Sequence, residues 1–173
     1  MTTLNALLDR AAQEGGERPA FVMGEREISF RAVRHEVLST AEGLRLSGFL
    51  RGDRVAIVHR NAPEFVVAYF ALNRLGAVAV PINFMVQKAD ELAYMLNDCG
   101  ARGVVTQTEF LPGLMAAAGR CPALKALWTT DLRAQGGYPA QVRDFAKLKA
   151  TPPEDFPRDP AVESDVAAIL YTS

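Results

Sequence analysis

Hydrophobic residues along the chain alternate between two spacings. Short apolar runs at residues 55–58 and 77–82 have the length of buried strands, and the segments at residues 62–75 and 89–99 have the three-to-four-residue spacing of helices. Weaker runs continue the order strand, helix, strand at residues 103–106, 108–118 and 126–128. Parallel strands need helical crossovers, so the pattern predicts an α/β domain with a mostly parallel sheet and flanking helices.

The segments outside this alternating region are shorter. The spacing predicts an opening helix that begins after Thr2 or Thr3 and ends at Gly15-Gly16, followed by a small hairpin over residues 21–30. A second helix is expected from Arg31 to Ser47-Gly48. Residues 141–149 are predicted to form a last short helix.

The helix predicted at residues 62–75 has clear signals at both ends. Asn61 precedes Pro63 and Glu64, which suits a helix start in which Asn61 is the N-cap and proline lies in the first turn. Gly76 is suited to ending the helix. The helix is apolar around most of its circumference, so we expect it to be buried on more than one side.

Composition and charge narrow the function classes. The 173 residues are 49% apolar and 23% charged with a net charge of −1, and no basic stripe is present, so nucleic-acid binding is not indicated. The longest apolar run, residues 65–72, is too short to cross a bilayer, and residues 1–10 lack the pattern of an export signal. These features predict a cytoplasmic protein without a transmembrane segment.

The last 23 residues differ from the rest. We expect a domain over residues 1–150, a proline-rich linker over 151–163, and the start of a buried strand over 164–173. An apolar strand that stops at Ser173 without a cap suggests a protein that continues further, although a terminal strand that simply closes the sheet would give the same pattern.

Five short pieces resemble the start of the AMP-forming acyl-CoA synthetase, or adenylate-forming ligase, superfamily. Each is weak alone, and their order and spacing carry the resemblance. They are Ile28-Ser29-Phe30, Gly52-Asp53-Arg54-Val55-Ala56-Ile57, Asn61-Ala62-Pro63-Glu64-Phe65, Gly76-Ala77-Val78-Ala79-Val80-Pro81-Ile82-Asn83 and Glu91-Leu92-Ala93-Tyr94-Met95-Leu96-Asn97-Asp98. Relatives commonly have proline after the asparagine of the fourth piece, where this chain has Phe84, and this departure bears on the subfamily.

The resemblance also covers the end of the chain. In this superfamily the strand after the linker leads into a loop that reads Tyr-Thr-Ser or similar, then Gly-Thr-Thr-Gly, and that holds ATP phosphates. Tyr171-Thr172-Ser173 matches the first three positions. The resemblance therefore implies Thr172 and Ser173 as ATP-binding residues, with ATP, Mg²⁺ and coenzyme A used by the full-length enzyme and none expected bound to this fragment.

Single residues give weaker indications. His59 follows a predicted parallel strand, where ligands bind in open α/β sheets, but without a carboxylate or nucleophile partner a structural role is favoured. His35 is expected on a helix surface, and the charged groups Asp90-Glu91 and Glu25-Arg26-Glu27 suit a first helical turn and a hairpin turn. Asn61 lies near the same strand end as His59, but helix capping explains it.

The two cysteines, Cys99 and Cys121, are expected to be reduced and buried, because neither their spacing nor an export signal suggests a bridge or a zinc site. No residue is therefore assigned a catalytic or metal-binding role.

The sequence predicts the N-terminal fragment of an acid–CoA ligase, inactive as the isolated chain. Its partners in the full-length enzyme would be a carboxylic acid, ATP and coenzyme A. The fragment is expected to form a homodimer or to self-associate, because truncation would leave apolar surface uncovered. The alternative is a standalone, non-catalytic, ligase-like module for protein association.

Overall fold

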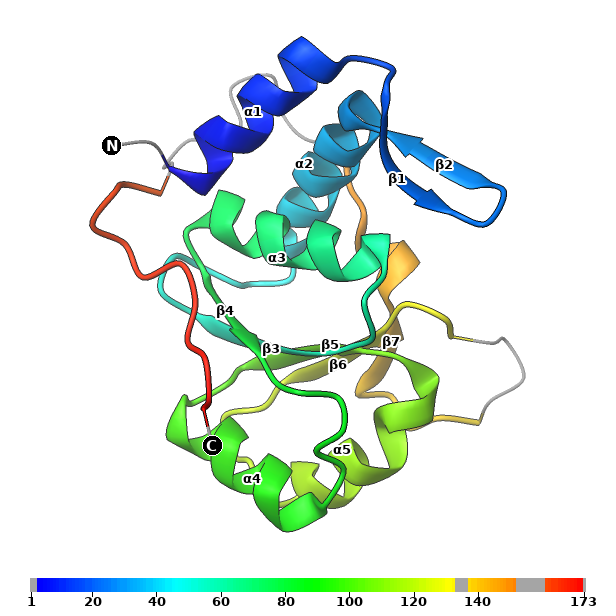
Figure 1. Cartoon of the computed structure of the whole chain (residues 1–173). Helices are drawn as coiled ribbons and strands as arrows, with labels where there is room; N and C mark the ends of the chain where they lie inside the picture. The colour runs from blue at the N-terminus through cyan, green and yellow to red at the C-terminus, as the bar shows by residue number, and fades with distance from the viewer. Residues whose placement is uncertain (1–2, 133–136, 152–160, 173) are drawn as a thin grey trace.

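A computed structural model describes residues 3–132, 137–151 and 161–172. A five-stranded sheet lies between helices that cover both of its faces, and a separate two-stranded hairpin projects to one side (Figure 1). The predicted α/β class with a parallel sheet and flanking helices is confirmed.

Every strand pairing in the central sheet is parallel. The strands lie in the order β4-β3-β5-β6-β7. Side chains alternate between the two faces: Val55 and Ile57 contribute to one apolar cluster, and Ala56 and Val58 to the other. Both faces are buried, which explains why the strands are continuous apolar runs in the sequence. The strands are β3 (Arg54–Val58), β4 (Val78–Pro81), β5 (Gly103–Thr106), β6 (Ala126–Thr129) and β7 (Val142–Asp144).

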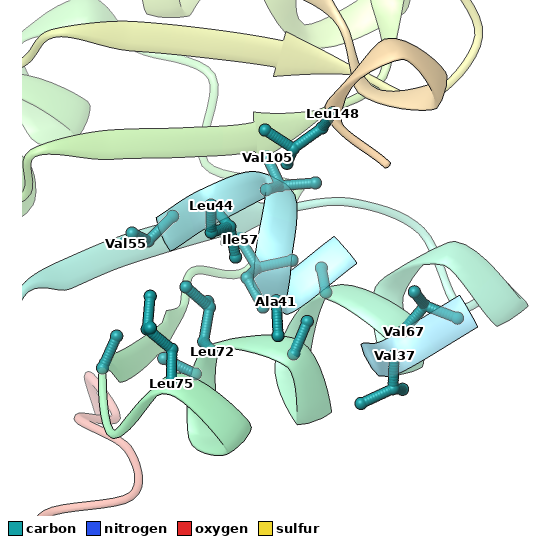
Figure 2. Packing of buried hydrophobic residues seen from close by; sticks show 14 of the residues in the cluster. Val37, Ala41, Leu44, Val55, Ile57, Val67, Leu72, Leu75, Val105 and Leu148 are labelled. Atoms are coloured by element: carbon teal, nitrogen blue, oxygen red, sulfur yellow. The ribbon is translucent and has the colours of Figure 1, made fainter. Parts of the chain in front are cut away.

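The helices divide between the two faces of the sheet. On one face lie α1 (Leu4–Gly15), α2 (Phe30–Leu46) and α3 (Pro63–Leu75), and on the other lie α4 (Ala89–Asp98) and the pair η1 (Thr108–Phe110) and α5 (Leu111–Ala118). In the close-up, side chains of α2 and α3 such as Ala41 and Leu72 pack against Ile57 of β3 (Figure 2). The predicted multi-sided burial of α3 follows from its position between the other two helices and the sheet.

A cluster of three charged side chains joins the three helices of the first face. Asp9 of α1 accepts hydrogen bonds from Arg34 of α2 at 2.7 Å and from Arg74 of α3 at 2.6 Å. The Arg74 side chain is 6% exposed. Burial alone would raise the pKa of Asp9, but the hydrogen bonds and charges of the two arginines outweigh it and hold the pKa below its ordinary value.

The hairpin pairs β1 (Pro19–Met23) with β2 (Arg26–Ser29) in antiparallel register, as the sequence predicts. An ion pair between Arg26 and Glu64 at 2.8 Å ties it to the first turn of α3. Ser29 also caps α2, because its hydroxyl accepts a hydrogen bond from the Ala32 N–H at 3.2 Å.

Most predicted helix ends are confirmed, but one cap is wrong. Thr3 caps α1, and Gly76 ends α3 in the left-handed conformation with φ 75°. The N-cap of α3 is Ala62 rather than Asn61, and no side chain caps it. Pro63 takes the first turn, as predicted, and the Phe65 N–H donates to the Ala62 carbonyl oxygen at 3.1 Å rather than to a capping side chain.

The prediction of one short helix over residues 141–149 is also wrong. Residues Val142–Asp144 form β7, which adds to the sheet beside β6, and Phe145–Leu148 form the short 3-10 helix η2. Val142 is 8% exposed, and its burial beside Leu127 favours the strand. The Asp144 carboxylate then accepts a hydrogen bond from the Ala146 N–H at 2.9 Å and starts the turn.

The last described segment, residues 161–172, runs along the outer edge of β4 and reaches α4 (Figure 1). These residues form one parallel bridge with β4. In it the Ala79 N–H donates to the Ala167 carbonyl oxygen, and the Ala79 carbonyl oxygen accepts from the Ile169 N–H. The next ladder bond would need an N–H at position 81, and Pro81 has none, so the pairing stops there.

The sequence predicts the start of a buried strand over residues 164–173. This prediction of burial is wrong, since Val166 is 58% and Leu170 68% exposed. The predicted linker at residues 151–163 lies largely outside the described residues, and the domain boundaries at 150 and 163 stay predictions.

Candidate functional site

The carboxyl end of the sheet contains a topological switch point. β3 is the first strand of this sheet in the chain, and it lies between β4, reached through α3, and β5, reached through α4. The connections therefore turn to opposite sides at the β3–β5 junction. Open α/β sheets bind ligands in the crevice outside the strand ends at such a junction.

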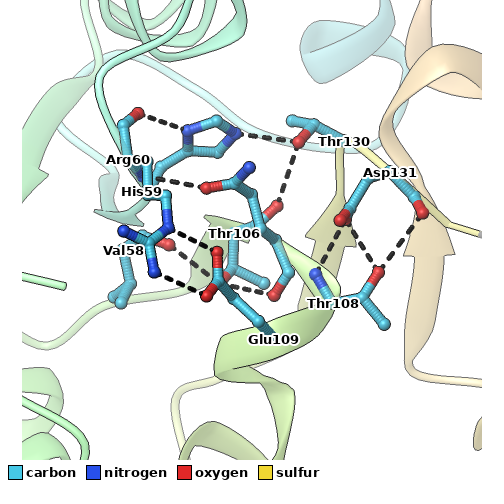
Figure 3. A network of polar contacts seen from close by, with 9 residues as sticks. Val58, His59, Arg60, Thr106, Thr108, Glu109, Thr130 and Asp131 are labelled. Carbon is cyan, nitrogen blue, oxygen red and sulfur yellow. Dashed lines mark hydrogen bonds and ion pairs between the residues drawn. The ribbon is translucent and has the colours of Figure 1, made fainter.

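His59 lies at this junction, directly after β3, and is 3% exposed. Its Nδ1 is 2.7 Å from the Arg60 carbonyl oxygen, and its Nε2 is 2.8 Å from the Thr130 hydroxyl oxygen after β6 (Figure 3). A carbonyl oxygen only accepts, so Nδ1 carries a proton. His59 thus links the ends of two strands, in agreement with the structural role that the sequence favours.

Arg60 follows His59 at the strand ends, and its side chain is 54% exposed. Its guanidinium makes two hydrogen bonds to the Glu109 carboxylate, at 2.7 and 2.8 Å, and lies over the rings of Phe84 and Phe110. These hydrogen bonds raise the pKa of Arg60 and lower the pKa of Glu109. The Arg60 N–H also donates to the Gln107 side chain at 2.9 Å.

A second polar contact joins the ends of β5 and β6. The Asp131 carboxylate accepts hydrogen bonds from the Thr108 N–H and from the Thr108 hydroxyl, both at 2.7 Å (Figure 3). Thr106, at the end of β5, donates its hydroxyl proton to the Val58 carbonyl oxygen at 2.8 Å. These groups hold the strand ends in register, and their hydrogen-bonding capacity is used within the protein.

The junction therefore links the ends of β3, β5 and β6 through side-chain hydrogen bonds. Its one buried imidazole faces a hydroxyl and a carbonyl oxygen, with no carboxylate to orient it as a general base. Sequence reasoning found His59 but missed Arg60, Glu109, Thr130 and Asp131. A signal was present, because polar residues directly follow each of the strand runs β3, β5 and β6.

The residues implied as ATP-binding lie elsewhere, at the end of the segment that runs beside β4. Thr172 is exposed, and Ser173 lies outside the described residues. The preceding residue, Tyr171, is fixed to α4: its hydroxyl lies 2.8 Å from the Asp98 carboxylate and 3.0 Å from the Met95 carbonyl oxygen. Burial and the Asp98 carboxylate raise the pKa of Tyr171. The role of Thr172 and Ser173 stays a prediction.

The other candidates have ordinary surroundings. His35 is exposed on α2, Asp90 pairs with Arg120 at 2.6 Å, and Glu91 pairs with Lys88 at 3.1 Å. Glu25 and Glu27 are exposed on the hairpin, and Asn61 is exposed before α3.

Both cysteines are buried free thiols, as predicted, and burial raises the pKa of each. Within the described ranges, no three His, Cys, Asp or Glu side chains come together as a metal site. No helix among the described residues is long and apolar enough to cross a membrane.

The fold and its switch point define a doubly wound α/β protein, and comparison with known proteins identifies the family. The family of AMP-binding enzymes matches residues 8–173. The chain belongs to this family. The resemblance read from the five short sequence pieces is therefore confirmed, including the assignment to the N-terminal part of these proteins.

Relatives with assigned activities are CoA ligases. The chain is 30% identical over 167 residues to a 4-hydroxybenzoate–CoA/benzoate–CoA ligase of Rhodopseudomonas palustris, covering 96% of this chain and 30% of that protein. It is 34% identical over 155 residues to a crotonobetaine/carnitine–CoA ligase of Proteus mirabilis, covering 86% and 29%. The chain thus spans about a third of the length of the relatives it matches.

Solved structures give the same picture. The anthranilate CoA ligase AuaEII, in complex with anthranoyl-AMP, is 29% identical with a TM-score of 0.75, over 83% of this chain and 27% of that one. The N-terminal domain of FACL13 from Mycobacterium tuberculosis is 26% identical with a TM-score of 0.77, over 100% and 42%. Coronafacic acid ligase from Pectobacterium brasiliense, at 20% identity and a TM-score of 0.86 over 99% and 33%, shares the fold.

Proposed function

We propose that this chain is the N-terminal part of an AMP-forming acid–CoA ligase. The observation that carries the proposal is the family match, which runs through to Ser173 and so includes the tripeptide that begins the phosphate-binding loop in this superfamily. The CoA ligase activities of the relatives support the choice of reaction.

The proposed reaction of the whole enzyme has two steps. A carboxylate oxygen of the acid attacks the α-phosphorus of ATP, so that an acyl-adenylate forms and pyrophosphate leaves with Mg²⁺. The sulfur of coenzyme A then attacks the acyl carbon, a thioester forms, and AMP leaves. We propose that this takes place in the cytoplasm and that the acid, ATP and coenzyme A are the partners of the whole enzyme.

In this proposal Thr172 and Ser173 bind ATP phosphates through their hydroxyl and backbone N–H groups. The surroundings of Thr172 fit that role, because it is exposed and follows a residue whose ring is fixed to α4. Loops that bind phosphate also need glycines, which let the backbone approach the anion. The 173 residues contain only the start of such a loop, and we therefore propose that the isolated chain is inactive.

The experiment begins with the reading frame after the codon for Ser173. We expect it to continue into Gly-Thr-Thr-Gly and a chain about three times as long. The complete product and the 173-residue chain are then compared for exchange of pyrophosphate into ATP that depends on a carboxylic acid. Exchange by the complete product alone supports the proposal, whereas a stop codon after Ser173 or exchange by the short chain contradicts it.

A variant of the complete product tests the site. Thr172→Val is expected to lower the exchange rate about 10-fold or more, since removing one preorganised hydrogen-bond donor has effects of that order. Thr151→Val is the matched control, because Thr151 is also an exposed threonine. An equal effect of the two substitutions would exclude a special role for Thr172.

A further inference from the structure

A cavity of about 320 Å³ lies beside the hairpin, between the first turns of α2 and α3 and the short helix η2. None of the residues that line this cavity belongs to the segment beside β4, residues 161–172. That segment lies on the opposite side of the molecule from the hairpin (Figure 1). The volume falls within the range of about 300–1,000 Å³ that is usual for small-molecule sites. An apolar cavity of about 150 Å³ already holds a benzene ring, so this one has room for a substituted ring.

The walls of the cavity are apolar and come from rigid elements. Val33 of α2, Val67 of α3 and Phe145 of η2 contribute, and they are 3%, 7% and 4% exposed. Ile28 of the hairpin covers one side. Because these side chains are held by the core that packs the helices on the sheet, the cavity does not need a ligand to form.

The charged groups of the lining neutralise one another. Arg26 pairs with Glu64, and Lys149 pairs with Glu36. These side chains are 29% to 60% exposed, so both pairs lie toward the solvent. Neither pair leaves a net charge for an ion to bind. The cavity therefore favours a neutral molecule.

The cavity also has a polar group with unused capacity. Thr130 is one of the lining residues, and its hydroxyl oxygen lies 2.8 Å from Nε2 of His59 and 3.4 Å from the Thr106 carbonyl oxygen. The Thr130 hydroxyl has one proton, and among the described residues the two groups within hydrogen-bond distance of it are His59 Nε2 and the Thr106 carbonyl oxygen. The Thr130 oxygen then keeps lone pairs that can accept a hydrogen bond from a ligand.

We propose that this cavity is a binding site for a neutral aromatic molecule that carries one hydrogen-bond donor, of the phenol type. The ring lies against Val33, Val67 and Phe145, and its hydroxyl donates to Thr130. His59 acts here as a positioning residue, because its Nε2 lies 2.8 Å from the Thr130 hydroxyl oxygen and holds it in place. The site is independent of the ATP loop and of the proposed ligase reaction.

The test uses phenol and toluene as matched probes, which have rings of the same size and differ in the donor. Each is titrated into the ¹⁵N-labelled 173-residue chain, and amide shifts are followed by NMR. We expect saturable shifts at Val33, Val67 and Phe145, with phenol binding about 2- to 10-fold more tightly than toluene, as one neutral hydrogen bond allows. Absence of saturable shifts at these residues overturns the proposal.

Three variants locate the binding. Thr130→Val should remove the preference for phenol over toluene, and Thr130→Ser, which keeps the hydroxyl, should restore it. Ala32→Leu fills the cavity from the first turn of α2 and should abolish binding of both probes. If Ala32→Leu does not fold, the preference for phenol over toluene in Thr130→Val and Thr130→Ser tests the proposal by itself. An unchanged preference in Thr130→Val, or probe shifts retained by folded Ala32→Leu, contradicts the site.

Discussion

The Tyr171 hydroxyl lies 2.8 Å from the Asp98 carboxylate, across 73 residues of sequence, and joins the last described segment to the end of α4. Without this contact the segment is still held by the Ala79 bridge to β4 and by the ion pair of Asp165 with Arg51. Tyr171→Phe should lower the free energy of local opening by about 1 kcal/mol, the net value of one hydrogen bond. Exchange of the Ile169 amide hydrogen, which bonds to Ala79, should then be about 5-fold faster.

Tyr94→Phe is the matched control, because Tyr94 lies on α4, the helix that Tyr171 contacts, and its side chain is 66% exposed. We expect no change at Ile169 in this variant. Equal exchange in the two variants would show that the Tyr171 hydroxyl does not hold the segment.

The charge cluster of Asp9, Arg34 and Arg74 should stabilise the helical layer. Asp9→Asn leaves the buried Arg74 guanidinium without its counter-charge, and we expect a loss of about 1–2 kcal/mol in the free energy of unfolding. The loss is smaller than for a fully buried pair, because the Asp9 side chain is 37% exposed and solvent screens the charge. Urea unfolding measures it, with Glu14→Gln, an exposed carboxylate on α1, as control.

The same cluster predicts a pH dependence. The pKa of Asp9 lies below its ordinary value of 3.8 in the folded protein, so its contribution is present above that pH and is lost as the pH falls below it. The loss of stability of the original chain between pH 5 and pH 3 should therefore be smaller in Asp9→Asn. Parallel pH profiles for the two proteins would exclude this linkage.

His59 should contribute more to the free energy of unfolding than His35, the other histidine. His59→Leu removes the hydrogen bonds of a buried imidazole to the Arg60 carbonyl and the Thr130 hydroxyl. We expect a loss of about 1–3 kcal/mol in thermal or urea unfolding. His35→Leu, on the exposed face of α2, should change stability by less than about 0.5 kcal/mol. A small effect at both positions would contradict the structural role of His59.

Pro81 limits how far residues 167–171 pair with β4. Pro81→Ala supplies an N–H that faces the Ile169 carbonyl in the register set by the Ala79 bridge. We expect the new amide at position 81 to be protected from hydrogen exchange by about 10-fold or more and the pairing to extend by one bond. Exchange at the rate of an unstructured peptide would mean that another constraint ends the pairing.

Val166 and Leu170 expose apolar surface on the same segment, and we expect them to cause self-association of the isolated chain. The double variant Val166→Ser, Leu170→Ser should lower the average mass in sedimentation at high concentration and reduce binding of an apolar dye. Leu50→Ser removes a leucine of similar exposure, 62%, before β3 and serves as control. A monomeric original chain without dye binding would refute the expectation.

The sequence is informative where one residue dominates a local choice. The spacing of Val33, Val37, Ala41 and Leu44 defines α2, and Gly76 ends α3 because it takes a positive φ. The continuous apolar run at residues 55–58 predicts a strand covered on both faces, and both sides of it are buried. Such features depend on neighbours a few residues apart.

Prediction fails where distant residues decide. Residues 142–144 have no strand signal of their own, and their strand depends on pairing with β6. The pairing of residues 167–169 with β4 is limited by Pro81, more than 80 positions earlier. The contact of Arg60 with Glu109 joins residues 49 apart, and its geometry depends on the β3–β5 pairing. At Asn61 the local signal was present, but the helix begins one residue later, with Ala62 as N-cap and no capping side chain.

The order of the elements has a consequence for biosynthesis. All five strands of the parallel sheet are complete at Asp144, before the segment that runs beside β4 has been translated. The sheet can therefore assemble while the following residues are still in the ribosome, with the outer edge of β4 unpaired. Proline at position 81 interrupts the row of N–H groups on that edge, which makes the nascent protein a poor template for intermolecular β-pairing.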